Sequence, residues 1–354
     1  MKLFNGIAQT TVIILIVIIL LLGTIYNFLL SPVSRNDELV IVEIAEGLSS
    51  IQIAEQLKKQ NLIKDVFIFL SYLKLNNIKN LQAGEYYLSE SMGVKKITQK
   101  LSRGEVIDYS ISITFPEGIN MRHIAAIIEK ETNNTKEDVF NLLKDERYIA
   151  SLIDQYWFLT DEIKNKDIYY PLEGYLFPNT YKFKDKDVTV SEIFTIMLQQ
   201  MGKVLLRAKA SINKTDYTIH KFLTLASIVQ SEGLNNRDMG DIAGVFYNRL
   251  ARKRPLESCV TACYAMRNDT CTASTINTKI ISLYNTYLTN MGGKLPVGPI
   301  SNPGDVAIQA VIHPKEHQYL YFLSDKYGHT YFFKTYQEHQ KKQRELEAKG
   351  DWLK

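Results

Sequence analysis

Residues 218–233 read Thr-Ile-His-Lys-Phe-Leu-Thr-Leu-Ala-Ser-Ile-Val-Gln-Ser-Glu-Gly, a run in which apolar side chains recur at helical spacing. Five of them follow i, i+3, i+4, i+6, i+7 spacing, which predicts one apolar helix face: Phe222, Leu225, Ala226, Ile228 and Val229. Glu232 comes three residues after Val229, so the predicted helix carries a carboxyl group on its apolar face. Gly233 is expected to end the helix.

The position of Glu232 has a chemical consequence. A carboxyl group at the end of a buried helix face is partly desolvated, and desolvation raises a carboxyl pKa. A Glu that keeps its proton near neutral pH suits general acid catalysis. The pattern alone equally allows Glu232 to be an ordinary residue of the last helical turn that reaches solvent.

Other carboxylates compete with Glu232 for a catalytic role. Glu173 lies within an aromatic-rich turn at residues 169–178, whose rings are suited either to stacking on sugars or to core packing. Asp238 and Asp241 follow Glu232 closely, and we expect them to cap a helix over residues 242–250.

Composition limits the function classes that fit the chain. Its 354 residues suggest about two domains, and 45% hydrophobic with 23% charged residues is typical of folded proteins. Lys and Arg number 42 against 38 Asp and Glu, a net charge of +4 that is too balanced to indicate nucleic acid as a partner. Walker A, GxGxxG and HExxH patterns are absent from the sequence, so we expect neither a cofactor nor a metal.

The N-terminal segment is predicted to cross a membrane over residues 10–30. Residues 3–34 contain no Asp, Glu, Lys or Arg, and no A-x-A-like cleavage site follows. Lys2 precedes the span and residues 35–38 are net negative, so the positive-inside tendency places residues 1–9 in the cytoplasm. We therefore expect an uncleaved signal anchor in the inner (plasma) membrane, crossed once, with the remaining chain periplasmic or extracytoplasmic.

An internal repeat follows the anchor. Glu46-Gly47 matches Glu117-Gly118, and each pair lies between a predicted strand and a predicted amphipathic helix. The two strands are expected at residues 39–44 and 109–115, and each Gly is expected to turn the chain from strand to helix. Glu46 and Glu117 fit a capping or first-turn position better than an active-site role.

The remaining patterns complete an α+β fold class. Further strands are expected at residues 83–88, 319–323 and 329–333, and further helices at residues 66–75, 94–101 and 337–349. The predicted order is a transmembrane helix, a small αβ unit at 37–107 and a mixed α/β domain at 108–354, which includes the second repeat at 109–130.

The three cysteines, Cys259, Cys263 and Cys271, are too few for a disulfide framework. Their stretch contains no His that would complete a zinc tetrad. An oxidising compartment would allow one pair to bridge. We favour the interpretation that the cysteines are unpaired packing residues.

Residues 225–232 resemble the signature of the YceG-like (MltG) family of endolytic murein transglycosylases. Segments that resemble the family follow in the same order along nearly the whole chain: 173–181, 243–250, 284–287, 295–304, 310–314, 319–322 and 328–332. The N-terminal anchor agrees with the family, and residues 37–107 resemble its LysM-like unit. The resemblance implies a lyase of the cell wall that cuts the β-1,4 bond between N-acetylmuramic acid and N-acetylglucosamine, leaving a 1,6-anhydro ring.

The resemblance also implies roles for individual residues. The family's acid/base Glu corresponds to Glu232 rather than Gln230, a position where relatives often have Glu. Six residues are candidates for binding the sugar or peptide groups, with a structural hydrogen bond as an equal alternative for each: Asn248, Arg249, Ser258, Thr261, Tyr284 and Asn285. The chain departs from the family at Cys259 and Asn179, where Asp is usual, and at Val260, where Pro is usual.

The implied partners are peptidoglycan glycan strands and the membrane, with glycan polymerases and transpeptidases as neighbours in the cell-wall machinery. Two other functions remain open. One is a non-catalytic scaffold that binds glycan. The other is a water-using glycoside hydrolase in which Glu232 pairs with Glu173 or Asp238.

Overall fold

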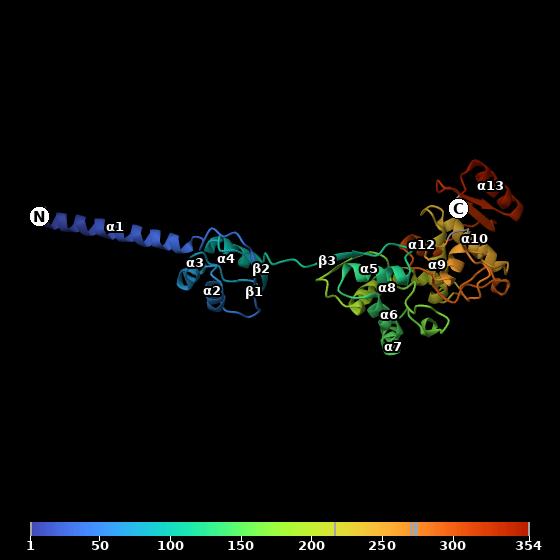
Figure 1. Cartoon of the computed structure of the whole chain (residues 1–354), viewed down its shortest axis with the longest axis horizontal. Helices are drawn as coiled ribbons and strands as arrows, with labels where there is room; N and C mark the ends of the chain where they lie inside the picture. Colours follow the sequence, from blue (N-terminus) through green and yellow to red (C-terminus); the bar gives the residue numbers. More distant parts are fainter. Residues whose placement is uncertain (1, 216, 270, 272–274, 353–354) are drawn as a thin grey trace. The chain divides into compact units, whose positions relative to one another are not determined.

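The computed structural model describes residues 2–352 except 216, 270 and 272–274 (Figure 1). The chain separates into two compact units, Met1–Tyr109 and Ser110–Lys354. Its elements are mixed α+β, and each of its three sheets is an antiparallel pair of strands among the described residues.

Helix α1 (Lys2–Leu30) contains the expected apolar span. Its segment Thr10–Leu30 has 21 residues, a mean hydropathy of 2.8 and no burial within the protein. About 20 apolar helical residues cross the hydrocarbon core of a bilayer. Within the described residues, this is the one helix long and apolar enough to do so, and it is therefore compatible with a single membrane anchor.

The rest of the first unit is a strand pair covered by three helices. Its elements are β1 (Val40–Ile44), α2 (Ser50–Lys59), α3 (Val66–Leu75), β2 (Gly84–Leu88) and α4 (Val94–Arg103). Strand β1 pairs antiparallel with β2, which places Val42 opposite Tyr86, both fully buried. Ser49 begins α2 through a capping box with Gln52. The core of this unit is separate from that of the second unit.

The second unit begins with the other half of the repeat. Its first elements are β3 (Ile111–Thr114), α5 (Met121–Glu131), α6 (Lys136–Lys144), α7 (Glu146–Gln155), η1 (Asp161–Lys164), β4 (Thr180–Phe183) and α8 (Val190–Ile212). Strand β3 pairs antiparallel with β4, as β1 does with β2. Gly47 and Gly118 adopt φ values of +82° and +78°, a conformation that favours glycine.

The two glutamates of the repeat are not the helix caps. Ser49 caps α2, and the side chain of Asn120 accepts hydrogen bonds from the backbone at the start of α5. Glu46 and Glu117 instead belong to the turn that precedes each cap. The expected capping role was therefore wrong, because the turn extends two residues beyond each Gly before the helix begins.

The second half of this unit is built around α9 (Ile219–Glu232). It also contains α10 (Met239–Ala251), α11 (Cys259–Ala265), η2 (Thr289–Met291), α12 (Asp305–Ile312), β5 (Tyr321–Ser324), β6 (Thr330–Phe333) and α13 (Tyr336–Lys349). Helix α9 contacts α10, α11 and α12, and Figure 1 shows it in yellow beside the orange α10.

Helix α9 is buried on all sides, whereas its apolar spacing predicts one buried face. Every residue from Phe222 to Val229 is buried, including the polar Thr224 and Ser227. Each of these two hydroxyl groups donates a hydrogen bond of 2.7 Å to a backbone carbonyl of the preceding turn. Ser227 also accepts from the Ile300 N–H at 3.1 Å. Because their hydrogen bonds are satisfied locally, these polar residues can lie in the core.

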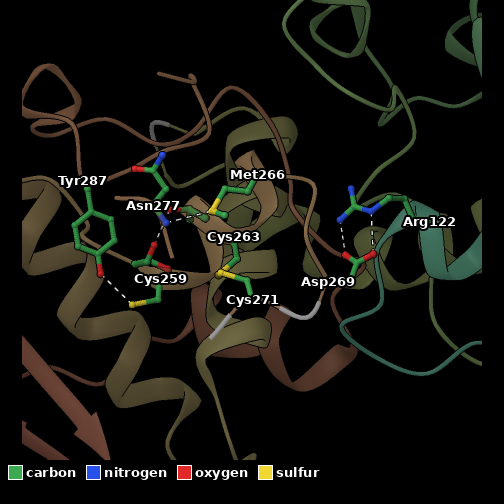
Figure 2. Close-up of a disulfide and its surroundings, with 10 residues drawn as sticks. Arg122, Cys259, Cys263, Met266, Asp269, Cys271, Asn277 and Tyr287 are labelled. Atoms are coloured by element: carbon green, nitrogen blue, oxygen red, sulfur yellow. Dashed lines mark hydrogen bonds and ion pairs between the residues drawn. A yellow bond between two sulfur atoms is a disulfide. The ribbon is translucent and has the colours of Figure 1, made fainter. Parts of the chain in front are cut away.

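The cysteine expectation was wrong for two of the three residues. Cys263 and Cys271 form a disulfide, and only Cys259 is free (Figure 2). Helix α11 ends at Ala265, and Arg267 then takes a left-handed φ of 52°, which turns the chain back. The turn brings the two Cα atoms to 5.6 Å, a separation that a disulfide spans.

The left-handed glycine of the second unit gives a stability prediction. Gly118→Ala is expected to lower the free energy of unfolding by about 1–2 kcal/mol, because an added Cβ is disfavoured at positive φ. The new Cβ would also lie 3.3 Å from Gln230 Cγ. Urea unfolding of the full-length protein in detergent, followed by tryptophan fluorescence, measures this change, since both Trp residues lie in the second unit.

The control is Gly240→Ala in α10. Its added Cβ would make an ordinary 3.4 Å contact with the flexible Lys315 side chain, and its φ is not left-handed. We expect unchanged or slightly higher stability, since Ala favours a helix over Gly. Equal losses in both variants would contradict the conformational explanation.

Candidate active site

Glu232 is the last residue of α9, at the point where the helix leaves the core. The side chain is partly buried, whereas Val229 and Ile228 before it are fully buried. Gly233 follows with an ordinary negative φ, so it does not end the helix through a left-handed turn. A Cβ at this position would lie 2.9 Å from Met239 Cγ, so glycine allows the close approach of α10.

Three donors from the start of α11 hold the Glu232 carboxylate. Ser258 Oγ donates to Glu232 Oε1 at 2.6 Å. The backbone N–H groups of Val260 and Cys259 also form hydrogen bonds to the carboxylate. The carboxyl group therefore joins the end of α9 to the beginning of α11.

The pKa of Glu232 reflects two opposing influences. Burial raises it above the ordinary value of a Glu, and the three hydrogen bonds lower it in part. The effect of burial is the larger one, so the net pKa is raised. Such a group keeps its proton to a higher pH than an exposed Glu, while its anion still has three donors.

The segment that supplies these donors is fixed by Arg249. This buried guanidinium donates from Nε to the Pro255 carbonyl at 2.8 Å and from Nη1 to the Leu320 carbonyl at 3.0 Å. It also forms an ion pair with Glu257, which has a left-handed φ of 51°. A non-glycine residue in that conformation is strained and needs such support.

Two threonines support the same segment from the other side. Thr286 Oγ1 accepts from the Ser258 N–H at 3.1 Å and lies 2.8 Å from Thr261 Oγ1. Thr261 Oγ1 donates to the Ser258 carbonyl at 2.7 Å. Ser258 is therefore held through both its backbone groups, which fixes the direction of its hydroxyl toward Glu232.

A thiol and a phenol lie next to the carboxyl group. Cys259 Sγ is 3.0 Å from the hydroxyl of Tyr287 (Figure 2). Desolvation raises the pKa of this thiol, and the charge of Glu232 raises it further. Burial, Cys259 and Glu232 likewise raise the pKa of Tyr287. Both groups therefore stay neutral beside Glu232, where an Asp at position 259 would add a second negative charge.

The six candidate binding residues differ in what they contact. Ser258 bonds to Glu232, Arg249 and Thr261 hold the segment around Ser258, and the other three are engaged elsewhere. Asn248 Nδ2 donates to the carbonyls of His317 and Tyr319. Asn285 Nδ2 donates to two carbonyls of its own loop, and the hydroxyl of Tyr284 accepts from the Tyr169 N–H at 3.3 Å.

Glu173 occupies a buried network in the core. Its Oε2 accepts from the Met121 N–H at 3.0 Å and the Tyr264 hydroxyl at 2.9 Å, and its Oε1 accepts from Asn302 Nδ2 at 3.0 Å. Burial raises the pKa of Glu173 to about 7, although these donors and Arg122 act in the opposite direction. Both carboxylate oxygens are therefore used by contacts within the protein.

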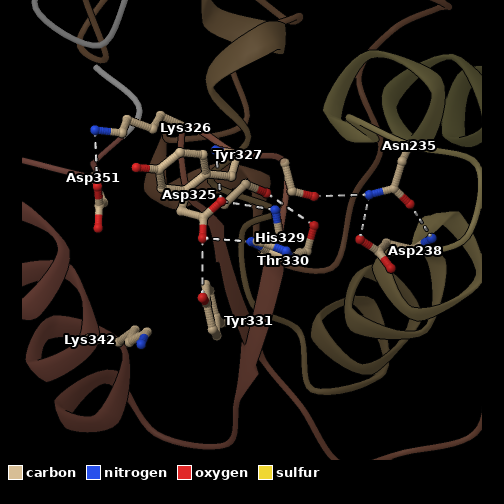
Figure 3. A network of polar contacts seen from close by, with 12 residues as sticks. Asn235, Asp238, Asp325, Lys326, Tyr327, His329, Thr330, Tyr331, Lys342 and Asp351 are labelled. Carbon is tan, nitrogen blue, oxygen red and sulfur yellow. Dashed lines mark hydrogen bonds and ion pairs between the residues drawn. The ribbon is translucent and has the colours of Figure 1, made fainter.

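Asp238 is also engaged, and it does not cap α10 with its side chain. It occupies the N-cap position just before Met239 but makes no side-chain capping bond. Asp241 lies within the first turn, paired with Lys315. The capping expectation was therefore wrong for both residues, because the helix begins at Met239 rather than at residue 242. Asn235 Nδ2 donates to Asp238 at 2.8 Å and to the Gly328 carbonyl at 3.1 Å (Figure 3).

The Gly328 loop that Asn235 contacts is held together by hydrogen bonds to Asp325. Asp325 accepts hydrogen bonds from the Tyr327 and His329 N–H groups, from the His329 ring and from the Tyr331 hydroxyl (Figure 3). Burial opposes its ionisation, but these bonds lower the pKa of Asp325 to about 2. The hairpin tip between β5 and β6 thereby fixes the loop that follows Glu232.

The sequence did not single out Tyr287, and it named Gln230 only as a position where relatives often have Glu. Tyr287 belongs to the family-like segment 284–287. Its contact with Cys259 joins residues 28 positions apart, and no local sequence pattern indicates such a contact. Gln230 Oε1 accepts from the Gly304 N–H at 2.9 Å, and Gly304 packs closely against the Glu117 carboxylate. A neutral amide at position 230 thus joins α9 to the start of α12. Among the described residues, no group of His, Cys, Asp and Glu side chains is arranged to hold a metal.

Ser258→Ala is expected to raise the pKa of Glu232 further, because the hydroxyl stabilises the ionised form. A pH titration of the ¹³C carboxyl resonance of Glu232 measures the shift. Ser231→Ala is the matched control, since Ser231 bonds to Ser227 and Ser301 rather than to Glu232. An unchanged titration in Ser258→Ala would show that the 2.6 Å bond does not control this pKa.

Glu173→Gln is expected to lower the free energy of unfolding by about 1–3 kcal/mol. Both oxygens of Glu173 accept hydrogen bonds, so the NH₂ group of Gln would face a donor whichever of the two positions it occupies. The loss should shrink between pH 5 and pH 8. The wild-type folded pKa of about 7 exceeds the unfolded value, so ionisation destabilises the wild type as pH rises through this range. Urea unfolding of both proteins at pH 5 and pH 8 tests this. A difference in the free energy of unfolding that grows with pH would contradict the prediction.

Sequence and structure comparisons place these features in a known family. The YceG-like family model matches residues 42–345. The endolytic murein transglycosylase of Bacillus subtilis (strain 168) is 37% identical over 326 residues, which cover 91% of this chain and 89% of that protein. The endolytic murein transglycosylase of Streptococcus pneumoniae serotype 2 (strain D39) is 33% identical over 328 residues, covering 88% of this chain and 59% of that protein.

A solved structure agrees with these matches. The crystal structure of a yceG-like protein from Listeria monocytogenes aligns with a TM-score of 0.61 at 37% sequence identity. The alignment covers 86% of this chain and 99% of the Listeria chain. Together, the family model and the curated relatives show that this chain belongs to the YceG-like family.

Proposed function

We propose that this member of the YceG-like family cuts the β-1,4 bond between N-acetylmuramic acid and N-acetylglucosamine, leaving 1,6-anhydro ends. Relatives named endolytic murein transglycosylase align over most of the chain, so the chain is an enzyme of the lytic transglycosylase class. In this reaction Glu232 acts as the single acid and base.

One observation carries this assignment. Glu232 combines a raised pKa with three hydrogen-bond donors at the exit of a buried helix. A carboxyl group that keeps its proton to a higher pH than an exposed Glu can give that proton to a leaving glycosidic oxygen. The same donors stabilise the carboxylate that remains after the proton has been given up.

The reaction then proceeds in two proton transfers. Glu232 first protonates the glycosidic oxygen as the bond to C1 of the muramic sugar breaks, and the substrate's N-acetyl group supports the cationic centre. The Glu232 carboxylate next accepts the proton of the C6 hydroxyl as that oxygen attacks C1. The anhydro ring closes, and the carboxyl group is protonated again without a water molecule entering the product.

A single-carboxylate reaction fits the surroundings of Glu232 better than a carboxylate pair. Glycosidases that use water normally place two carboxyl groups on opposite sides of the bond. Both oxygens of Glu173 accept hydrogen bonds within the core, and Asp238 is held by Asn235. Glu173 therefore has no oxygen free to activate water, and Asp238 has one oxygen engaged by Asn235.

The candidate binding residues receive different proposed roles. Ser258 orients the Glu232 carboxyl group, and Arg249 with Thr261 keeps the Ser258 segment in place. Asn248, Tyr284 and Asn285 bond mainly to other parts of the protein, which supports a structural contribution to the walls of the site.

The anchor gives the proposed enzyme its location. If Thr10–Leu30 spans the inner (plasma) membrane with residues 1–9 in the cytoplasm, the part of the first unit after Leu30 and all of the second unit face the cell wall. The first unit would then serve as a LysM-like module for glycan at the membrane surface. Nascent strands leaving their polymerases are the substrate that such an enzyme meets first, so peptidoglycan polymerases and transpeptidases are its proposed neighbours.

The decisive experiment incubates the full-length protein in detergent with uncrosslinked nascent peptidoglycan and identifies the new ends by mass spectrometry. We expect anhydromuramic ends from the wild type and a rate lower by roughly 10²–10⁴-fold in Glu232→Gln, since an acid/base group contributes about that factor. Glu316→Gln, an exposed carboxylate of the same unit, is the matched control and should retain activity.

Two results would overturn the proposal. Reducing ends that incorporate ¹⁸O from labelled water would identify a hydrolase. Glycan binding without any cleavage in the wild type would identify a scaffold.

A further inference from the structure

A concave region lies in the same unit as Glu232 but on other elements. This cleft of about 940 Å³ is formed by α6, α7 and residues 163–171, with Arg267 on its wall. Glu232 does not line it. The elements around it carry no part of the acid/base chemistry.

The cleft has an excess of positive charge. Four basic side chains line it, Lys144, Arg147, Lys164 and Arg267, against one acidic residue, Glu146. Lys164 pairs with Asp161. Among the residues that the structure describes, the other three basic groups have no carboxylate within ion-pair distance. These exposed cations are therefore available to an anionic ligand.

Aromatic rings form part of the same wall. The Arg267 guanidinium lies 4.1 Å from the centre of the Tyr169 ring, and Tyr170 stacks on Phe140 at 5.6 Å. A guanidinium stacked on a ring keeps its edge N–H groups free for a carboxylate. The rings can contact sugar or peptide groups, and the cations can pair with carboxylates. The cleft therefore suits a ligand that carries both kinds of group.

Helix α11 links this cleft to the acid/base site. It begins beside Glu232, through Ser258, and ends just before Arg267. Seven helical residues span about 10 Å, which is within the reach of a short oligosaccharide with an attached peptide. Tyr169 also donates from its hydroxyl to the Ala265 carbonyl at the end of α11.

The loop that carries Arg267 is held at both sides. The Cys263–Cys271 disulfide closes it, and Asp269 pairs with Arg122 of α5 (Figure 2). The left-handed φ of Arg267 is thus maintained by covalent and ionic contacts around it. These contacts constrain the backbone on both sides of Arg267, which lowers the cost of ordering this residue around a ligand.

We propose that this cleft binds carboxylates of the peptide stems on the glycan strand that Glu232 cuts. The inference rests on the proposed transglycosylase function and adds a peptide-recognition subsite to it. Arg147, Lys144 and Arg267 pair with the stem carboxylates while the glycan passes toward α11. The enzyme therefore prefers strands that carry peptides over strands from which the peptides have been removed.

The test uses full-length Glu232→Gln protein in detergent and two purified glycans, one with uncrosslinked peptide stems and one stripped by an amidase. We expect tighter binding of the stem-bearing glycan. Adding Arg147→Glu should raise its Kd by roughly three- to tenfold and leave binding of the stripped glycan unchanged. An acidic residue in the first turn of α7 suits the helix dipole, so the variant should fold.

Lys203→Glu on α8 is the matched control, because it makes the same charge change on an exposed residue away from the cleft. Equal affinity for both glycans, or equal weakening by Lys203→Glu, would overturn the peptide subsite. This binding measurement does not depend on turnover. A failure of the proposed function would appear separately, as absent anhydro ends in the wild type despite a normal preference for stem-bearing glycan.

Discussion

The site depends on how a carboxyl group is accommodated at the end of a buried helix. Burying an ionisable group is costly unless donors replace the lost water. Glu232 meets this constraint with Ser258 and two backbone N–H groups, all from the first residues of α11. Because residues 222–229 of α9 are all buried, the helix places the Glu232 carboxyl group at the edge of the core, beside α11. The geometry of the site is therefore decided by whatever holds residues 258–260 in place.

That support comes from groups far apart in sequence. Arg249 of α10 donates hydrogen bonds to the Pro255 and Leu320 carbonyls and forms an ion pair with Glu257. Thr286 accepts a hydrogen bond from the Ser258 N–H. These contacts are polar, yet they lie in a mostly buried region where each unsatisfied group would cost free energy. Candidate binding residues can thus matter for activity without touching substrate, because they position the one hydroxyl that does touch Glu232.

Local sequence patterns predicted the position of α9 but not how completely it is buried. The apolar spacing of residues 222–229 identified α9, and the matching glycines identified the two turns with φ near +80°. The same spacing missed that α9 is buried all round, because Thr224 and Ser227 read as polar although their hydroxyls bond within the helix. The Cys263–Cys271 pair and the Glu173 network depend on turns and on contacts such as Tyr264, 91 residues away, that no local pattern encodes.

The proposed one-carboxylate mechanism makes opposite demands on the same group. As an acid, Glu232 must hold its proton near neutral pH, which requires burial; as a base, its anion must be tolerated, which requires donors. The two influences on its pKa, desolvation upward and three hydrogen bonds downward, meet both demands at one position. A neutral thiol at Cys259 preserves this balance, since the charge of a neighbouring carboxylate would repel the Glu232 anion and raise the pKa of Glu232 further. The departure from Asp at position 259 is therefore compatible with catalysis by Glu232 alone.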